Sequence, residues 1–100
     1  MFYSPGVPEP ADELLLARRR AFGKRLRSLR ENRGLSQTAT AAAADLARGY
    51  YSGVESGQHN ISLDNLFALA DTLGVDIAEL FNGLDVGAHH GGKREQVDGE

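Results

Sequence analysis

The side chains best suited to chemistry lie between Leu35 and Gly57, and they are hydrogen-bond donors rather than nucleophiles or metal ligands. Arg48, Tyr50 and Ser52 follow one another closely there. An arginine carries a planar fork of N–H donors that fits a phosphate or the edge of a base. The chain has no cysteine, and it lacks the paired-carboxylate, Gly-x-Ser-x-Gly and Gly-Lys phosphate-loop motifs of enzymes. We therefore expect a binding protein without enzymatic activity or a cofactor.

Two short helices joined by a tight turn are needed to position these donors. Ser36 is a good N-cap, and the alanine-rich run Thr38–Ala44 favours a helix after it. Asp45 falls at the turn, where a residue must tolerate the left-handed backbone conformation. Arg48–Glu55 forms the second helix, and Gly57 ends it. The pattern predicts a helix-turn-helix over residues 36–56.

This segment resembles the helix-turn-helix of the Xre/Cro/phage-repressor superfamily, whose pattern is roughly G-L-S-Q-x-x-L-A-x-x-A-G-[VL]-x-x-x-x-[IV]-S-x-[IV]-E-x-G. The resemblance covers residues 22–81. Within the superfamily, RGYYSGVE followed by NISL is most similar to the controller proteins of restriction–modification systems, which often have R-T-Y-I-S-x-I-E and then N-I-S-L. The residues that match the superfamily pattern are Gly34, Leu35, Ser36, Gln37, Ala41, Ala44, Leu46, Ser52, Val54, Glu55 and Gly57.

Three residues depart from that pattern. Thr40 stands where the family has leucine, Asp45 replaces the turn glycine, and Tyr51 replaces the usual Ile or Val. Thr40 therefore loses volume and gains a hydroxyl at a packing position. We hypothesise that the larger Tyr51 fills the space beside Thr40, because volume-conserving changes are tolerated better than an open cavity.

The resemblance implies that the second helix enters the major groove of double-stranded DNA with its N-terminal residues at the base edges. Arg48 is the long donor at that end. We favour recognition of a guanine edge by Arg48, with a phosphate contact or a surface arginine as alternatives. Gly49 and Gly53 permit close approach of the backbone but supply no side chain. Part of any specificity would then come from DNA shape.

The other DNA contacts implied by the resemblance involve the DNA backbone as well as bases. Tyr50 is expected to contact phosphate through its hydroxyl, or to pack on the helix surface. Ser52 is expected at a base or a phosphate, or facing solvent. Gln37 lies in the first turn of the first helix, where it positions backbone N–H groups. His59 and Asn60 fall in a loop that often contacts phosphate in this family, but the loop lacks Lys or Arg.

Glu55 is interpreted as structural, because a carboxylate facing DNA would repel it. In the family, the corresponding acid pairs with an arginine of the first helix, which here is Arg30. Removal of one partner from such a pair, if buried, costs about 3–5 kcal/mol.

The charges are unevenly distributed along the chain. The net charge is −3. Residues 18–48 nevertheless hold nine basic and two acidic side chains, whereas residues 49–85 hold six acidic ones and no Lys or Arg. This asymmetry suggests one face for a polyanion and another for a different contact. Alternatively, Arg18–Arg20 merely solvate a helix.

The length of 100 residues, 41% hydrophobic content and 25% charged content are typical of one small globular domain. No apolar run approaches the roughly 20 residues that a membrane span needs. The N-terminus also lacks a signal-peptide pattern. We therefore expect a cytoplasmic protein with no membrane partner. His89 and His90 lack the further ligands of a zinc site, so we expect no metal.

The fold class expected from these elements is all-α: a compact five-helix, lambda-repressor-like domain with an extended first helix. We expect this domain over residues 12–83, a flexible arm over residues 1–11 and a disordered tail over residues 84–100.

The helices outside the central motif also have recognisable ends. The first is expected to begin near Asp12 and to end near Asn32. Ser62 caps the fourth helix and Gly74 closes it. Asp76 with Glu79 resembles a capping box that opens a short fifth helix.

The expected function is that of a sequence-specific DNA-binding transcriptional regulator that binds operator half-sites as a homodimer. The alternative is an antitoxin or protein-interaction module of the same fold that neutralises or binds a partner protein. The resemblance implies that the fifth helix and its neighbourhood form the dimer interface, unless these residues fill the monomer core. The candidates are Ile77, Leu80 and Phe81, with Leu66 or Leu73 as alternatives.

Overall fold

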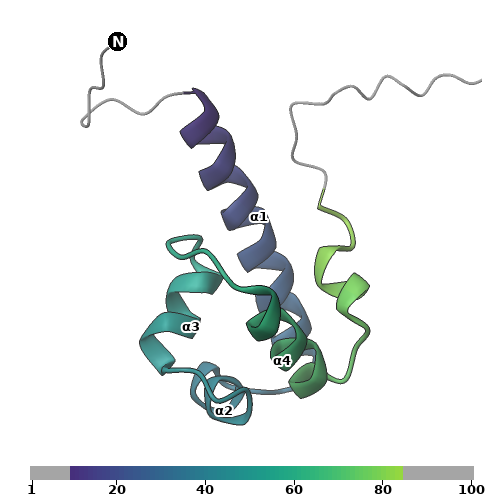
Figure 1. The fold of residues 1–100 in the computed structure, drawn as a ribbon. Coiled ribbons are helices and arrows are strands. Elements are labelled where there is room, and N and C mark those ends of the chain that lie inside the picture. Colours follow the sequence, from purple (N-terminus) through teal and green to yellow (C-terminus); the bar gives the residue numbers. More distant parts are fainter. Residues whose placement is uncertain (1–9, 85–100) are drawn as a thin grey trace, which may run out of the picture.

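The computed structural model describes residues 10–84, and within this range it contains helices and no strand (Figure 1). The all-α prediction is therefore confirmed. The predicted arm up to residue 9, and the predicted tail from residue 85 with its two histidines, lie outside the described residues. The helices are α1 (Pro10–Asn32), α2 (Gln37–Ala43), α3 (Arg48–Glu55), α4 (Leu63–Leu73) and the 3-10 helix η1 (Ile77–Phe81).

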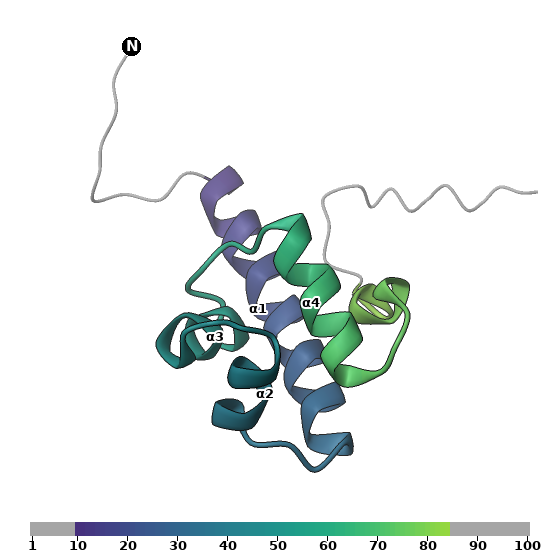
Figure 2. The ribbon, with the colours of Figure 1, turned by 60° about the horizontal axis from the view of Figure 1, so that its bottom comes forward.

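The long helix α1 is the axis around which the other elements are arranged. Figure 2 shows α2 and α3 on one side of α1 and η1 on the other. Helix α4 packs against both α2 and η1. The first turns of α1 project beyond the other helices (Figure 1). No helix among the described residues is long and apolar enough to cross a membrane.

A single core lies between these elements, because each helix buries an apolar stripe against its neighbours. Leu73 and Leu80 are fully buried in this core. The sequence offers both as candidates for a dimer interface or for the monomer core, and their burial assigns them to the core, since a fully buried side chain cannot reach a second molecule. The core residues are Phe22, Leu26, Ala41, Ala44, Tyr51, Val54, Leu69, Ala70, Leu73 and Leu80.

The ends of α2 and α4 follow the sequence predictions. The Ser36 hydroxyl accepts a hydrogen bond from the Ala39 N–H at 2.9 Å, and the Ser62 hydroxyl accepts one from the Asn65 N–H at 3.1 Å. Asp45 has a φ of +59°, as the turn requires. The N-caps and the turn residue are therefore confirmed.

Two expected helix starts differ in the structure. Helix α1 begins at Pro10, two residues earlier than expected, since proline is well suited to the first helical position. Helix η1 is a 3-10 helix, and Asp76 makes no side-chain capping bond. The Glu79 carboxylate binds the Arg25 guanidinium at 2.9 Å instead. The capping-box prediction was wrong because Glu79 faces α1 rather than its own helix start.

Candidate nucleic-acid interface

The first turn of α3 presents an open surface. Arg48 and Gly49 are both exposed, and no heavy atom lies within 4 Å of the position that a Cβ of residue 49 would take. Ala47 caps the helix without a side-chain hydrogen bond, so no side chain of the cap occupies the first N–H groups. An exposed arginine beside free backbone N–H groups can bind a base edge or a phosphate.

Tyr50 is held against the loop that follows α3. Its hydroxyl donates a hydrogen bond to the carbonyl oxygen of Asn60 at 2.9 Å. Its ring stacks on that of His59, with the centroids 5.6 Å apart and the planes 19° from parallel. The hydroxyl was expected to contact phosphate. In the free protein the hydroxyl proton is donated to Asn60, so the phosphate contact stays a prediction and would require this hydrogen bond to be exchanged.

Gly53 is buried, which contradicts its expected position at the DNA surface. A Cβ at residue 53 would lie 2.1 Å from Cδ2 of His59. The small residue therefore accommodates the imidazole of the loop and leaves no room for a base. Ser52, by contrast, is half-buried on the same helix and keeps its expected role as a prediction.

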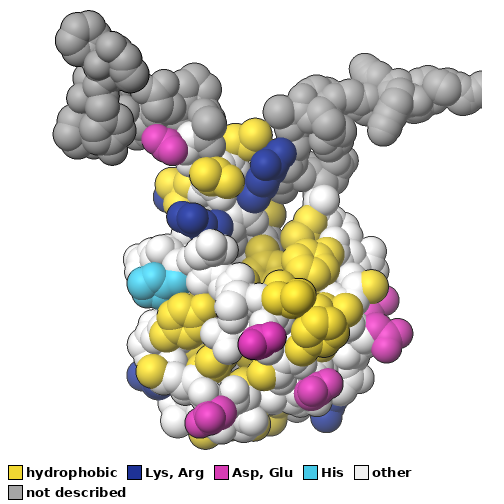
Figure 3. Space-filling model, in the orientation of Figure 1, with side chains coloured by type: hydrophobic (Ala, Val, Ile, Leu, Met, Phe, Trp, Pro, Cys, Tyr) yellow, Lys and Arg dark blue, Asp and Glu magenta, His cyan; other side chains and the backbone are white. Residues whose placement is uncertain are grey.

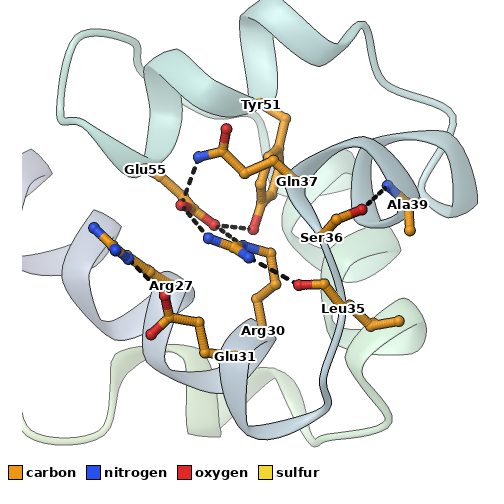
Figure 4. Close-up of polar contacts among 9 residues, drawn as sticks. All are labelled: Arg27, Arg30, Glu31, Leu35, Ser36, Gln37, Ala39, Tyr51 and Glu55. Carbon is orange, nitrogen blue, oxygen red and sulfur yellow. Dashed lines mark hydrogen bonds and ion pairs between the residues drawn. The ribbon is translucent and has the colours of Figure 1, made fainter.

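The expected Arg30–Glu55 ion pair is present and buried (Figure 4). The Arg30 guanidinium donates to the two carboxylate oxygens of Glu55 at 2.5 and 3.1 Å, and a third N–H donates to the carbonyl of Leu35 at 2.8 Å. Arg30 thus joins α1 both to the end of α3 and to the residue before the α2 N-cap.

Two further side chains complete the coordination of Glu55. The Tyr51 hydroxyl donates to Oε2 at 2.5 Å, and Nε2 of Gln37 donates to Oε1 at 2.9 Å. Gln37 was expected to position the DNA contact at the start of α2, and the structure shows its side chain directed at Glu55 (Figure 4). The network therefore fixes α1, α2 and α3 relative to one another.

The network shifts the protonation equilibria of its members. Burial by itself raises the pKa of Glu55, but the hydrogen bonds from Arg30, Tyr51 and Gln37 outweigh it and hold the pKa below its usual value. Burial, together with the bond to Glu55, raises the pKa of Tyr51. The hydrogen bond to Glu55 raises the pKa of Arg30. The cluster is therefore charged as an Arg–Glu pair with a neutral tyrosine at neutral pH.

Thr40 and Tyr51, two of the departures from the family pattern, are both fully buried. The Thr40 hydroxyl has no hydrogen-bond partner. The hypothesis that Tyr51 fills space beside Thr40 stays a hypothesis. What the structure adds is a polar role for Tyr51, whose hydroxyl binds Glu55.

Gly23 is a positioning residue that sequence reasoning missed. A Cβ at residue 23 would lie 2.0 Å from the carbonyl oxygen of Glu55, so only glycine lets α1 approach the end of α3 this closely. A glycine inside an otherwise regular helical pattern is the signal that could have indicated a close contact.

Several basic residues between residues 18 and 48 have acidic or carbonyl partners within the protein. Arg25 binds Glu79 and Arg27 binds Glu31, each at 2.9 Å. Arg30 binds Glu55, and Arg33 donates to the carbonyl of Leu73. The positive charge of residues 18–48 is therefore partly used inside the protein. Among the described residues, no cluster of three or more His, Asp or Glu could hold a metal ion.

These features define a class of protein, a small all-helical domain whose helix-turn-helix is locked to its first helix by a buried ion pair. The chain belongs to the helix-turn-helix family of DNA-binding transcription regulators, of the Xre type, and the family profile matches residues 26–80.

The relatives include control proteins. The chain is 45% identical to the control protein C.MunI of a Mycoplasma species over 65 residues, which are 64% of this chain and 88% of the relative. It is 36% identical to the control protein C.BamHI of Bacillus amyloliquefaciens, over 66% of this chain and 83% of the relative.

A solved structure shows the same similarity to a controller protein. The crystal structure of the restriction–modification controller protein C.AhdI from Aeromonas hydrophila superposes with a TM-score of 0.62 and 48% sequence identity. The superposition covers 63% of this chain and 96% of that chain. The predicted similarity to controller proteins is therefore confirmed.

Proposed function

We propose that this protein is a controller-type transcriptional regulator that binds operator half-sites sequence-specifically as a homodimer, with α3 in the major groove. The observation that carries the proposal is the exposed Arg48–Gly49 edge of α3, held in place by the buried Glu55 network. The similarity to control proteins over most of their length supports the same function.

Base recognition would rest on few side chains. Arg48 offers the bidentate donor that matches a guanine edge, and Gly49 lets the helix backbone approach the bases. Ser52 is the remaining candidate on α3, because His59 covers Gly53. With so few direct contacts, sequence-dependent DNA shape supplies part of the specificity.

The homodimer would form through an exposed apolar surface on α4 and η1. Leu63 and Phe67 are 62% and 49% exposed and Ile77 is half-buried, whereas Phe81, another candidate, packs against Phe22 of α1. Leu63 and Phe67 lie one helical turn apart, so they share a face of α4. Exposed apolar side chains in such number mark interaction surfaces. Two copies related by a two-fold axis would read half-sites about 34–36 Å apart.

Fluorescence anisotropy tests the DNA-binding function. The full chain is titrated onto DNA from its own upstream region and onto scrambled DNA, across a range of salt concentrations. Arg48→Ala should weaken binding to the specific DNA about 5- to 150-fold, as expected for about 1–3 kcal/mol of base discrimination, with little effect on scrambled DNA. The control Arg27→Ala removes an exposed arginine that pairs with Glu31 on α1. Weak binding with equal affinity for specific and scrambled DNA, unchanged by Arg48→Ala, would favour the protein-interaction alternative.

Sedimentation equilibrium tests the homodimer separately. Phe67→Ser should raise the dimer dissociation constant at least tenfold, because it removes an exposed aromatic ring from the proposed interface. Leu16→Ser, at an exposed leucine near the start of α1, is the matched control. Equal effects of the two substitutions would contradict the assignment of the interface to α4 and η1.

A further inference from the structure

A groove of about 620 Å³ lies between α1, the loop after α3 and the segment at η1. Its walls are mostly apolar and include Leu15, Phe22, Leu66 and Phe81, while Arg19 and Asn60 belong to its polar part. Figure 3 shows apolar side chains gathered between the upper part of α1 and η1, with basic side chains above them. A volume between about 300 and 1,000 Å³ is enough to enclose a compact ligand.

An aromatic pair in this groove is open on one side. The rings of Phe22 and Phe81 are 5.6 Å apart and tilted by 35°. Phe22 is 8% exposed, but Phe81 is 45% exposed. Phe81 therefore packs on Phe22 and keeps much of its surface uncovered. A third aromatic ring placed against Phe81 would extend the cluster with favourable edge or offset geometry.

We propose that residues 1–9 of the same chain fold back along α1 and bind in this groove, with Phe2 and Tyr3 placed against Phe81. Two of the seven aromatic residues of the chain occupy these adjacent positions, and Val7 adds a third apolar side chain. An arm of this composition matches an apolar groove with an open aromatic ring. The inference does not depend on the proposed DNA-binding function.

The charge of the segment favours the groove over DNA. Glu9 is its one carboxylate side chain, and it contains no Lys or Arg. An arm that binds the phosphate backbone needs cationic side chains. The groove, in contrast, combines apolar walls with two basic residues, Arg18 and Arg19. Its composition therefore complements an apolar segment that carries a single acid.

The segment is also long enough to reach the groove. Pro10 and Phe22 are twelve residues apart on α1, which corresponds to a rise of about 18 Å. With the reversal of direction at Pro8 to Pro10, where proline suits a turn, the six residues from Phe2 to Pro8 span up to about 20 Å when extended.

Because the natural chain has no cysteine, engineered disulfides give a direct test. In the full chain, Tyr3→Cys is combined with Asn60→Cys, an exposed residue of the groove. The control combines Tyr3→Cys with Thr38→Cys, an exposed residue of α2 outside the groove. We expect an intrachain disulfide that forms at least tenfold faster in the first variant, measured by non-reducing gel and mass spectrometry. Equal rates in the two variants, or disulfides only between chains, would overturn the proposal.

A second measurement uses the dye 1-anilinonaphthalene-8-sulfonate, whose fluorescence rises on apolar surface. The double substitution Phe2→Ser and Tyr3→Ser should expose the groove and increase dye fluorescence at least twofold, with an unchanged circular dichroism spectrum. Ser4→Ala in the same segment is the control. Fluorescence equal to that of the natural chain would overturn the proposal.

Discussion

Gly23 on α1 contacts the backbone carbonyl of Glu55 on α3 so closely that a Cβ at position 23 would lie 2.0 Å from that oxygen. The contact lies beside the buried ion pair between Arg30 and the side chain of the same Glu55. The backbone contact and the ion pair together fix the end of α3 on α1.

Gly23→Ala should therefore destabilise the fold, by about 1–3 kcal/mol or more, because backbone atoms of α3 must shift to admit a methyl group. Gly49→Ala is the matched control, since its Cβ would meet no atom within 4 Å. That substitution should stabilise α3 by about 0.5–1 kcal/mol. Urea denaturation measures both free energies of unfolding, and a neutral Gly23→Ala would contradict the close contact.

The Arg30–Glu55 pair should behave as one coupled unit. Arg30→Met or Glu55→Gln alone should cost about 3–5 kcal/mol of stability, because each leaves a buried charged group without its partner. The double variant should be less destabilised than either single one. Additive losses in this double-mutant cycle would show that the two side chains contribute independently.

The Arg30–Glu55 pair should also make the stability of the fold depend on pH in the acid range. The pKa of Glu55 is lowered in the folded state, so its contribution to stability is fully present above the pKa of an unfolded glutamate, about 4.3. That contribution is lost as the pH falls through the lowered folded value. The natural chain should thus lose its stability advantage over Glu55→Gln as the pH falls below about 4.

Tyr51 should make the stability of the fold depend on pH in the alkaline range. Its pKa is raised in the folded state, so its contribution to stability is present below the unfolded tyrosine pKa of about 10 and is lost as the pH rises above it. Tyr51→Phe removes a hydrogen bond to a carboxylate and should cost about 1.5–3 kcal/mol at neutral pH. Denaturation at pH 8 and pH 11 should show that this difference shrinks. A difference independent of pH would refute the assignment.

The effect of a substitution at Gly53 on stability should depend on the side chain of His59. Gly53→Ala places a methyl group where the exposed imidazole of His59 lies, so the ring must move away and the protein should lose up to the stacking on Tyr50, about 0.5–1.5 kcal/mol. His59→Ala should lose the stacking on Tyr50, worth about 0.5–1.5 kcal/mol. In the double variant the methyl group meets no ring, so Gly53→Ala should cost far less than in the natural chain. Thermal melting of the four proteins tests this coupling.

The sequence alone determined the features that depend on neighbours along the chain. Ser36 and Ser62 cap their helices by binding an N–H three residues away, and Asp45 and Gly74 adopt left-handed conformations at turns. Such contacts form within one turn of backbone, so residue type and spacing are enough to predict them. The Arg30–Glu55 pair spans 25 residues, and it was predictable through the resemblance to a family.

Tertiary structure decided the contacts between distant elements. It placed His59 over Gly53, directed the Tyr51 hydroxyl to Glu55 and buried Leu80 while it left Phe81 exposed. The apolar pattern of η1 shows that one face is buried but not which residue meets the core, because this depends on how η1 packs on α1 and α4. Side-chain partners are fixed only when packing sets the distance and angle between helices.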